Sequence, residues 1–312
     1  MHIDAVYLWC NPTDPQFREN LQLRAGGEHT ADALLPSRFA DHDELRYSLR
    51  SLEQYAPWIR TVHIVTAGER PAWLNVNHPK VRMVSHRAIF PEPSHLPCFN
   101  AHAIEMHLHR IPELSEHFLA FNDDFFLGRP ISSDEFFTPE GKPIVAFSEN
   151  IAPNGDPIES DEGWVCAMKN TFSLLEQRFG KIDRRIPVHQ ARPIRRDLYA
   201  RFCEEFPEAV RRTSANALRS CTDISPSWIA FPHYALHMNE AVIGDVDNLW
   251  LGVGDDETLL ADHLRLLAEK RPTLFCLNDQ TAANAEASWR LAITALEAYF
   301  PKPSTFEVAT GA

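Results

Sequence analysis

The stretch FLAFNDDFFLG, residues 118–128, is an apolar run that is interrupted by Asn122, Asp123 and Asp124. Continuous apolar runs of this kind are typical of strands that are buried on both faces of a sheet. Two adjacent carboxylates after such a strand can begin a turn or cap a helix, or they can bind a hard divalent cation. The apolar run resumes directly after Asp124, which favours a binding site, but the residues alone leave both explanations open.

Outward from this stretch, strand-like runs alternate with helical patterns. In residues 41–58, leucines at helical spacing follow a candidate N-cap at Asp41 or Asp43, and Asn100 begins a similar segment that ends before Pro112. The alternation predicts an α/β fold with a mainly parallel, Rossmann-like sheet that helices flank on both faces. Ligands of such sheets bind beyond the carboxyl ends of the strands. The predicted strands are 3–9, 61–66, 81–84, 118–121 and 143–147.

The chain changes character after residue 148. Residues 149–164 are rich in Pro, Gly, Asn and acidic residues and lack periodicity, which predicts a loop near the site. Residues 165–312 show mainly helical patterns. We therefore expect residues 1–312 to form a single domain, with an α/β half (1–148) and a helix-rich half (165–312).

Composition argues against several function classes. The formal net charge of -13 argues against nucleic acids and anionic membranes as partners, since both attract positive surfaces. The first residues show no signal-peptide pattern, and no uncharged stretch is long enough to cross a bilayer, so we expect a cytoplasmic protein. The six cysteines include no C-x-x-C pair, which predicts reduced thiols rather than disulfides or a zinc site.

Any phosphate group would have to be bound by a metal or by side chains. The chain has only 12 glycines and none of the glycine-rich phosphate-binding motifs. Basic candidates are Arg38 with Arg46, and the segment 181–197, which contains His189. Such charges are usually solvated or paired at a surface. In an acidic chain, however, the second cluster is the basic neighbourhood that a pyrophosphate requires.

Polar residues also stand between apolar ones elsewhere. His102, Glu105 and His109 share one face of the helical segment that begins at Asn100. They could bind a metal or supply a base, but the residues alone favour a hydrogen-bonded polar face. Further candidates, for which helix capping is the alternative, are Arg219, Asp223, Asn278 and Asp279.

Four blocks of the chain resemble the Stealth family, which includes bacterial capsule-type hexose-1-phosphate transferases and the catalytic subunit of lysosomal-enzyme GlcNAc-1-phosphotransferase. The second block is the most specific, and it runs from SRFADHDELRYSLRS at residue 37 through SHLPCFNAHAIEMHLHRI to FNDDFFLGRPISSDEFF, which ends at residue 137. The others are IDAVYLWCNPTDPQF (3–17), residues 186–228, and FCLNDQ (275–280) with YFPKPSTFE (299–307). In the first block, Leu8, Cys10 and Pro12 replace the usual Thr, Val and Gly.

The resemblance implies a GT-A-like fold and an enzyme that depends on Mg²⁺ or Mn²⁺. Such an enzyme transfers a hexose or HexNAc 1-phosphate from a nucleotide sugar, for instance UDP-GlcNAc, to an acceptor hydroxyl and releases the nucleoside monophosphate. For this chain we expect a glycan or small-molecule acceptor, a role in capsule polysaccharide biosynthesis and peripheral association with a membrane. The alternatives are a GT-A-type glycosyltransferase, which releases the nucleoside diphosphate, and a catalytically silent binding protein that keeps the fold.

The resemblance also implies roles for individual residues. Residues 1–148 would bind the nucleotide sugar and the metal, and residues 165–312 would complete the active site. Either His189 or Glu105 would be the base that takes the acceptor's proton, and His189 is favoured because the ordinary pKa of histidine lies nearest the working pH. The expected metal ligands are Asp123, Asp124 and Asp279. The other assignments are Arg219 and Asp223 as catalytic residues, and Asp4, Trp9, Arg38, Arg46, Asn122 and Asn278 as donor-binding residues.

Overall fold

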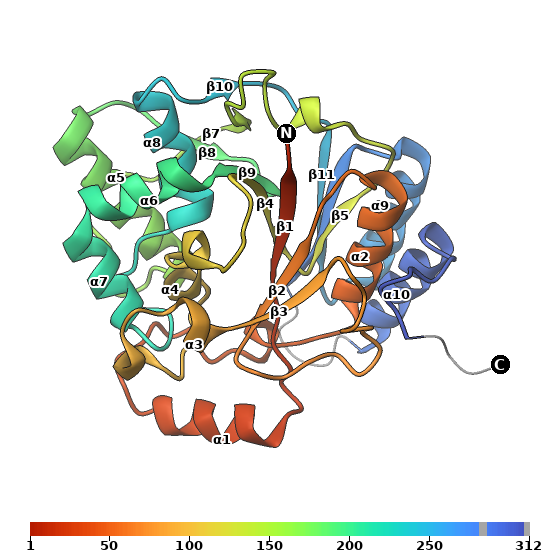
Figure 1. Cartoon of the computed structure of the whole chain (residues 1–312). Helices are drawn as coiled ribbons and strands as arrows, with labels where there is room; N and C mark the ends of the chain where they lie inside the picture. The colour runs from red at the N-terminus through yellow and green to blue at the C-terminus, as the bar shows by residue number, and fades with distance from the viewer. Residues whose placement is uncertain (281–285, 309–312) are drawn as a thin grey trace.

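In the computed structural model, which describes residues 1–280 and 286–308, a five-stranded sheet forms the centre of the fold (Figure 1). Its strands are β1 (Ile3–Leu8), β2 (Val62–Thr66), β3 (Val81–Ser85), β4 (His117–Asn122) and β9 (Arg192–Arg195). They lie in the order β3-β2-β1-β4-β9; the first four are parallel, and β9 is an antiparallel edge strand. The mainly parallel sheet predicted from the sequence is therefore confirmed.

Helices cover both faces of this sheet. Successive side chains of a strand point to opposite faces, so apolar strand residues need a partner layer on each side. In β4, Leu119 and Phe121 pack into one hydrophobic core, whereas Phe118 and Ala120 pack into the other. The first core also holds side chains of α2 (Glu44–Tyr55), α9 (Glu257–Lys270) and α10 (Glu286–Tyr299). The second holds side chains of α3 (His86–Ile89), α4 (Ala101–Glu105), α5 (Gly163–Phe179), α6 (Arg196–Glu205), α7 (Pro207–Ala215) and α8 (Phe231–His237). Figure 1 shows these two groups on opposite sides of β1, with α1 (Pro15–Arg24) at the bottom of the view.

The stretch 118–128 spans two sheets. Its first part is β4, and its last part, β5 (Phe125–Leu127), joins a second sheet with the order β11-β12-β5. In that sheet β11 (Asn248–Val253) runs parallel and β5 antiparallel to β12 (Leu274–Asp279). Two serine side chains of α2 hydrogen-bond to the backbone of β5. The sequence is apolar on both sides of the Asp pair because each strand enters a different sheet, and the two carboxylates lie at the corner between them.

Several element boundaries differ from those predicted. The predicted strand 143–147 divides into β6 (Ile144–Val145) and β7 (Phe147–Ile151), so the loop predicted at 149–164 begins later, and α5 already starts within it. Residues 192–195, which belong to a stretch with a helical pattern, form β9. The half predicted to be helix-rich also supplies β11 and β12. Strand formation at such places depends on the partner strand more than on local pattern. The remaining pairs join β6 to β10 (Val242–Ile243) and β7 to β8 (Arg185–Pro187).

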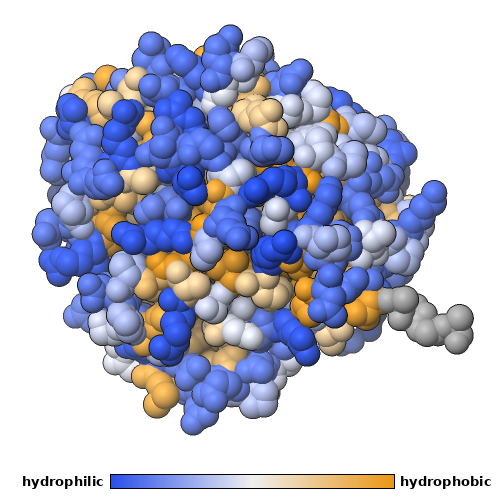
Figure 2. Space-filling model, in the orientation of Figure 1, coloured by the Kyte–Doolittle hydropathy of each residue, from blue (hydrophilic) through white to orange (hydrophobic). Residues whose placement is uncertain are grey.

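Hydrophilic side chains cover most of the face shown in Figure 2, and apolar side chains show between them in separate patches. Among the described residues, none of the helices combines the length and the apolar character that crossing a bilayer requires. All six cysteines are free thiols, as the sequence predicts.

An ion-pair cluster ties the C-terminal segment to α2. Arg50 donates from Nε and Nη2 to the two carboxylate oxygens of Glu307 (2.7 and 2.9 Å), and Arg46 Nε donates to Glu307 Oε2 (2.6 Å). Burial raises the pKa of Glu307, but hydrogen bonds from Arg50, the Ser304 amide and Arg46 outweigh it and lower this pKa to about 2. Arg46 therefore helps to hold the C-terminal segment on α2, and its role in donor binding stays a prediction.

We expect Glu307→Gln to lower the free energy of unfolding by about 3 kcal/mol at neutral pH. This is the stabilisation that corresponds to a pKa lowered from 4.5 to about 2 in the folded state. Because the folded-state pKa is depressed, this stabilisation is complete above the ordinary glutamate pKa and is lost as the pH falls through the folded-state value. The difference between variant and wild type should therefore shrink between about pH 5 and pH 2. Urea denaturation at a series of pH values measures it.

The matched control for this variant is Glu53→Gln. The Glu53 carboxylate accepts hydrogen bonds from Thr305 in the same C-terminal segment, without an ion pair to a described residue. We expect this change to cost less than about 1 kcal/mol. Equal losses in the two variants, or a Glu307→Gln loss that does not change with pH, would contradict the role given to the ion pair.

Candidate active site

The carboxyl ends of the parallel strands meet at one edge of the central sheet. Leu8, at the end of β1, lies opposite Val65 of β2 and Asn122 of β4, so the three strands end together. The turn Asp123–Asp124 follows directly after β4. The Asp pair therefore lies at the edge where sheets of this kind bind their ligands.

Asp124 is held from the neighbouring sheet. Its Oδ2 atom accepts hydrogen bonds from Cys276 Sγ (3.2 Å) and Asn278 Nδ2 (3.5 Å), which both lie on β12. Its buried Oδ1 atom has no hydrogen-bond partner among the described residues. Burial raises the pKa of Asp124 to about 6, although the two hydrogen bonds oppose this shift. Burial and the nearby Asp124 carboxylate also raise the pKa of the Cys276 thiol well above its ordinary value.

Three further carboxyl groups surround this corner. Burial raises the pKa of Asp123 well above its ordinary value, and repulsion from Asp124 and Asp41 raises it further. Burial and repulsion from Asp123 raise the pKa of Glu44, at the start of α2, well above its ordinary value. Burial raises the pKa of Asp41 to about 6. The buried indole of Trp9 donates to Asp41 Oδ2 (3.2 Å) and so holds this carboxylate at the sheet edge. Such a group of mutually repelling acids is suited to binding a cation, which would stabilise the ionised forms.

Asp279 ends β12 near the same edge. Its Oδ2 atom lies 3.9 Å from Nε2 of His42, a ring that stacks on Trp289 at 4.1 Å. Along a strand, alternate side chains share a face, so Cys276 and Asn278 point to one face and Asp279 to the other. This explains why Asp124 contacts the first two.

Within the described part of the chain, a single group of three potential metal ligands converges. It consists of Asp124, His189 and Cys276, with one ligand atom of each within 4.8 Å of the others. The expected set of Asp123, Asp124 and Asp279 does not form such a group. Cys276 is not among the site residues predicted from the sequence, although its position two residues before Asn278 on a strand places it on the same face as a predicted site residue.

His189 lies in the loop before β9, with its ring edge-on to Phe125 (4.9 Å between centroids) and to Trp228 (5.1 Å). Its Nδ1 atom is buried and has no partner among the described residues. Burial, together with the positive charges of Arg192 and Arg219, lowers the pKa of His189 to about 3. The imidazole is therefore neutral at physiological pH and can accept a proton.

Arg192 is a buried cation at the same edge. It lies in the basic segment 181–197 but is not among the site residues predicted from the sequence. Its Nη2 atom donates to Asn122 Oδ1 (3.1 Å) and to Glu105 Oε1 (3.4 Å), and its guanidinium lies over the ring of Phe125. Glu105 Oε2 also accepts a hydrogen bond from Ser227 Oγ (2.6 Å). Both oxygens of Glu105 are thus engaged, which suits a positioning residue better than a base.

Arg219 and Arg38 are two further positive charges, and they lie close enough to repel each other. Burial lowers the pKa of Arg219 to about 10, and repulsion from Arg38 contributes to this shift. Arg38 Nη2 donates to Asp32 Oδ2 (2.6 Å), whose other oxygen accepts from the Gly163 amide at the start of α5. A Cβ atom at Gly163 would lie only 3.2 Å from Cβ of Arg219, so this glycine leaves room for the arginine. Two guanidiniums that repel each other are suited to binding an anion.

Asp223 is fully buried and saturated with hydrogen bonds. Its carboxylate accepts from Asn216 Nδ2 (2.7 Å), Asn100 Nδ2 (2.9 Å) and the Ser220 amide (3.0 Å), and His102 Nδ1 lies 3.4 Å away. The side chain therefore holds the loop before it against α4, and its catalytic role stays a prediction. Asn100 also caps α4, as predicted.

Asp4 lies at the amino end of β1, away from the Asp pair. Arg60 donates to both of its carboxylate oxygens (2.8 and 2.6 Å), and the Ser115 amide donates to Oδ2 (2.8 Å). Burial raises the pKa of Asp4, but hydrogen bonds from Arg60, His63 and Ser115 outweigh it and lower this pKa below the ordinary range. Asp4 thus anchors the amino end of β1, at the opposite end of the strand from the Asp pair, and its role in donor binding stays a prediction.

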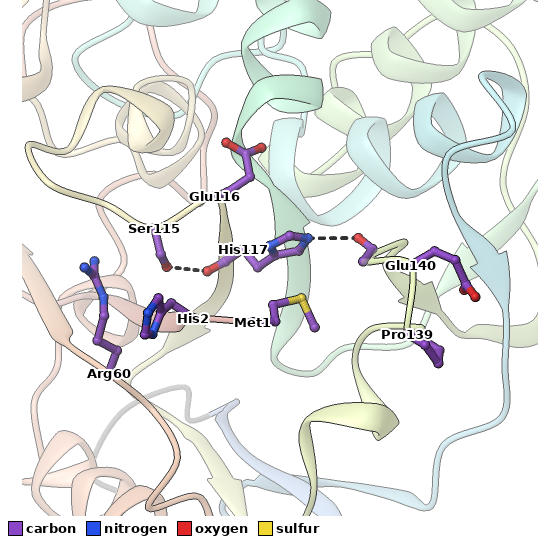
Figure 3. A pocket seen from close by; sticks show the side chains of 9 residues that line it. Met1, His2, Arg60, Ser115, Glu116, His117, Pro139 and Glu140 are labelled. Atoms are coloured by element: carbon purple, nitrogen blue, oxygen red, sulfur yellow. Dashed lines mark hydrogen bonds between the residues drawn. The ribbon is translucent and has the colours of Figure 1, made fainter.

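Two surface cavities lie elsewhere on the molecule. One of about 440 Å³ lies beside the amino ends of β1 and β4, and Figure 3 shows His117 and Glu140 among the residues that line it. Nε2 of His117 lies 3.0 Å from the carbonyl oxygen of Gly141. The other, of about 770 Å³, is lined by residues that include His107, His109 and Cys203. The second cavity includes His109, one of the three polar residues on the helical face that begins at Asn100, but neither cavity is lined by Asp123, Asp124 or His189.

Comparison with known proteins gives matches along most of the chain. Family models for conserved regions 2, 3 and 4 of Stealth proteins match residues 38–145, 188–236 and 265–312. An exopolysaccharide phosphotransferase of Streptomyces coelicolor is 41% identical over 308 residues, which are 98% of this chain and 52% of that protein. The capsular polysaccharide phosphotransferase SacB of Neisseria meningitidis serogroup A is 34% identical over 311 residues, 98% of this chain and 57% of SacB. The chain thus spans about half the length of these curated relatives.

Among solved structures, the galactosyltransferase LgtC in complex with donor and acceptor sugar analogs aligns with 94% of this chain and 95% of its own, at 11% identity and a TM-score of 0.41. The turn with Asp123 and Asp124 lies within the match to region 2. His189, Arg192 and Arg219 lie within the match to region 3, and Cys276 lies within the match to region 4. The three matched regions therefore meet at the carboxyl edge of the central sheet.

Proposed function

Because this chain belongs to the Stealth protein family, we propose that it transfers a sugar 1-phosphate from a nucleotide sugar to an acceptor hydroxyl. The donor would carry a hexose or HexNAc, as UDP-GlcNAc does, and the products would be a phosphodiester and a nucleoside monophosphate. The names of the relatives support phosphotransfer in the synthesis of exopolysaccharide or capsular polysaccharide. The observation that carries the proposal is that the half-buried carboxylates of Asp123 and Asp124 and the buried cation of Arg192 lie at the same edge of the central sheet.

The donor set at the corner fits a divalent cation such as Mg²⁺ or Mn²⁺. Asp124 presents a buried oxygen without a partner among the described residues, and Asp123 adds a second carboxylate whose pKa is raised by burial and by Asp124. Carboxylate oxygens are the ligands that such hard ions prefer. We propose that these two residues hold the ion, with Asp279 near them. When bound, the ion would neutralise charge on the oxygens of the diphosphate.

The basic side chains would bind and orient the donor. Arg219 and Arg38, which repel each other in the free protein, would share a phosphate group, since an anion between them removes that repulsion. Arg192 would hold Asn122 and Glu105 in place through its two hydrogen bonds. Phosphoryl transfer depends mainly on positioning and on electrostatic stabilisation of the equatorial oxygens, and these residues supply both.

His189 would act as the base. The acceptor oxygen forms a bond to the phosphorus that bears the sugar, the bond from that phosphorus to the nucleotide phosphate oxygen breaks, and the acceptor proton passes to an imidazole nitrogen. The imidazole is neutral because burial and the positive charges of Arg192 and Arg219 lower its pKa, so a nitrogen lone pair is free for this proton. The same lowering of the pKa makes the ring a weaker base. A glycan or small-molecule acceptor and a cytoplasmic location with peripheral membrane association remain part of the proposal.

The nucleotide that is released distinguishes this proposal from the glycosyltransferase alternative. We expect incubation with a panel of UDP- and GDP-sugars, Mg²⁺ and oligosaccharide acceptors to yield the nucleoside monophosphate, identified by anion-exchange chromatography. The wild-type reaction with EDTA in place of Mg²⁺ is the control. A nucleoside diphosphate as the product would reject the proposed reaction, and failure to bind any divalent ion would favour the silent binding protein.

A further inference from the structure

The three converging side chains at the site come from segments far apart in the sequence. Asp124 lies in the corner after β4, His189 in the loop before β9, and Cys276 in β12. One ligand atom of each lies within 4.8 Å of the others, and Cys276 Sγ is 3.2 Å from Asp124 Oδ2. The buried atoms His189 Nδ1 and Asp124 Oδ1 have no partner among the described residues.

This set differs chemically from a magnesium site. Mg²⁺ prefers oxygen ligands in octahedral geometry, whereas one thiolate, one imidazole and one carboxylate are a ligand set for Zn²⁺. With metal–ligand distances of about 2.0–2.3 Å, the ligand atoms of a tetrahedral zinc site lie about 3.3–3.8 Å apart. Shifts of about 1 Å would therefore bring the three atoms to that spacing. Three protein ligands would leave the fourth position open.

We propose that Asp124, His189 and Cys276 form a binding site for Zn²⁺ or a similar thiophilic ion, which switches the enzyme off. Binding replaces the proton of the Cys276 thiol, which is released to solvent, and forms metal–sulfur, metal–nitrogen and metal–oxygen bonds. The ion, two anionic ligands and one neutral imidazole have no net charge. A buried site tolerates such a neutral set, because isolated charges are costly there.

Inhibition follows from the residues that the ion occupies. Zinc would take the Asp124 oxygen that the proposed Mg²⁺ site needs and the imidazole that is the proposed base. At a given set of ligands, Zn²⁺ binds more tightly than Mg²⁺ or Mn²⁺. Sulfur and nitrogen ligands increase this difference in affinity. The inhibitory consequence rests on the proposed function, whereas zinc binding does not.

Cobalt spectroscopy tests the site without any substrate. Co²⁺ replaces Zn²⁺ in such sites, and a Co²⁺–thiolate bond gives an intense near-ultraviolet charge-transfer band. We expect this band when Co²⁺ is added to wild type and its loss on addition of Zn²⁺. We expect Cys276→Ser to abolish the band, and Cys98→Ser to keep it, because Cys98 is a buried thiol outside the group, bonded to a backbone carbonyl. No band in wild type, or a band that persists in Cys276→Ser, would overturn the site.

Circular dichroism shows whether Cys276→Ser is folded. If it is not, His189→Ala provides a second test of the site. It should keep the sulfur band but weaken Co²⁺ binding by at least about 10–100-fold, since even indirect partners of a metal contribute that much. Unchanged affinity would remove His189 from the site. If Co²⁺ and Zn²⁺ bind but Zn²⁺ leaves transfer in the nucleotide-release assay unaffected, the inhibitory role is rejected. The spectroscopic result stands even if that assay finds no transfer at all.

Discussion

Asp124→Asn is expected to lower kcat/KM for sugar-phosphate transfer by at least about 10²–10³-fold, the range for removal of one preorganised electrostatic group. The asparagine has the same shape and keeps an oxygen that can accept from Cys276 and Asn278, so the corner between β4 and β5 should stay intact. What it loses is the negative charge. Titration calorimetry should show a parallel loss of Mg²⁺ binding, and steady-state kinetics at several Mg²⁺ concentrations measure the effect on transfer.

The control for this experiment is Asp134→Asn, which removes an exposed carboxylate on the turn after the corner. This variant should bind Mg²⁺ and turn over like the wild type. The metal assignment fails if Asp124→Asn keeps near-normal activity and Mg²⁺ affinity. If Asp279→Asn alone is inactive and no longer binds Mg²⁺, the metal is held at the end of β12 instead of at the corner.

His189→Ala is expected to lower kcat by about 10²–10⁴-fold, the contribution of a positioned general base. The substitution leaves a cavity between Phe125 and Trp228, which now flank the ring. Added imidazole should therefore enter this cavity and restore part of the activity, an effect that a purely structural role would not produce. Turnover with and without imidazole measures both effects.

Glu105→Gln is the matched comparison for the base. Its carboxylate accepts from Arg192 and Ser227, so we expect it to position these side chains and its loss to lower kcat by about tenfold. Imidazole should not rescue this variant. If His189→Ala turns over normally while Glu105→Gln is inactive, the two roles are reversed.

Local pattern predicted the elements that lie on long periodic segments. Strand β4 is predictable because residues buried on both faces form a continuous apolar run, and the helix after Asp43 is predictable from its leucine spacing. Strand β9 was missed because Arg192–Arg195 mixes polar and apolar residues at a sheet edge and pairs only because β4 is beside it. Edge strands depend on such partners.

The site was predicted in part for the same physical reason. A carboxylate pair at the end of an apolar run marks the ligand edge of a parallel sheet, and Asp123 and Asp124 lie there. Asp4, like Asp123 and Asp124, is a carboxylate next to apolar strand residues. The sequence pattern does not show which groups surround it in the folded protein. Its partner Arg60 is separated from it by 56 positions. Nor does the sequence show that the carboxylate of Asp223 is saturated with hydrogen bonds inside the protein.

The sequence by itself determined the α/β class, the carboxylate corner at residues 123–124 and the resemblance to a family of sugar-phosphate transferases. Only the tertiary structure decided which side chains meet there. Asp124 contacts Cys276 across 152 positions because β5 pairs antiparallel with β12, and Arg192 reaches Asn122 because β9 pairs with β4. Such pairings follow from the burial of whole sheets and helices, and a local window of sequence contains no record of them.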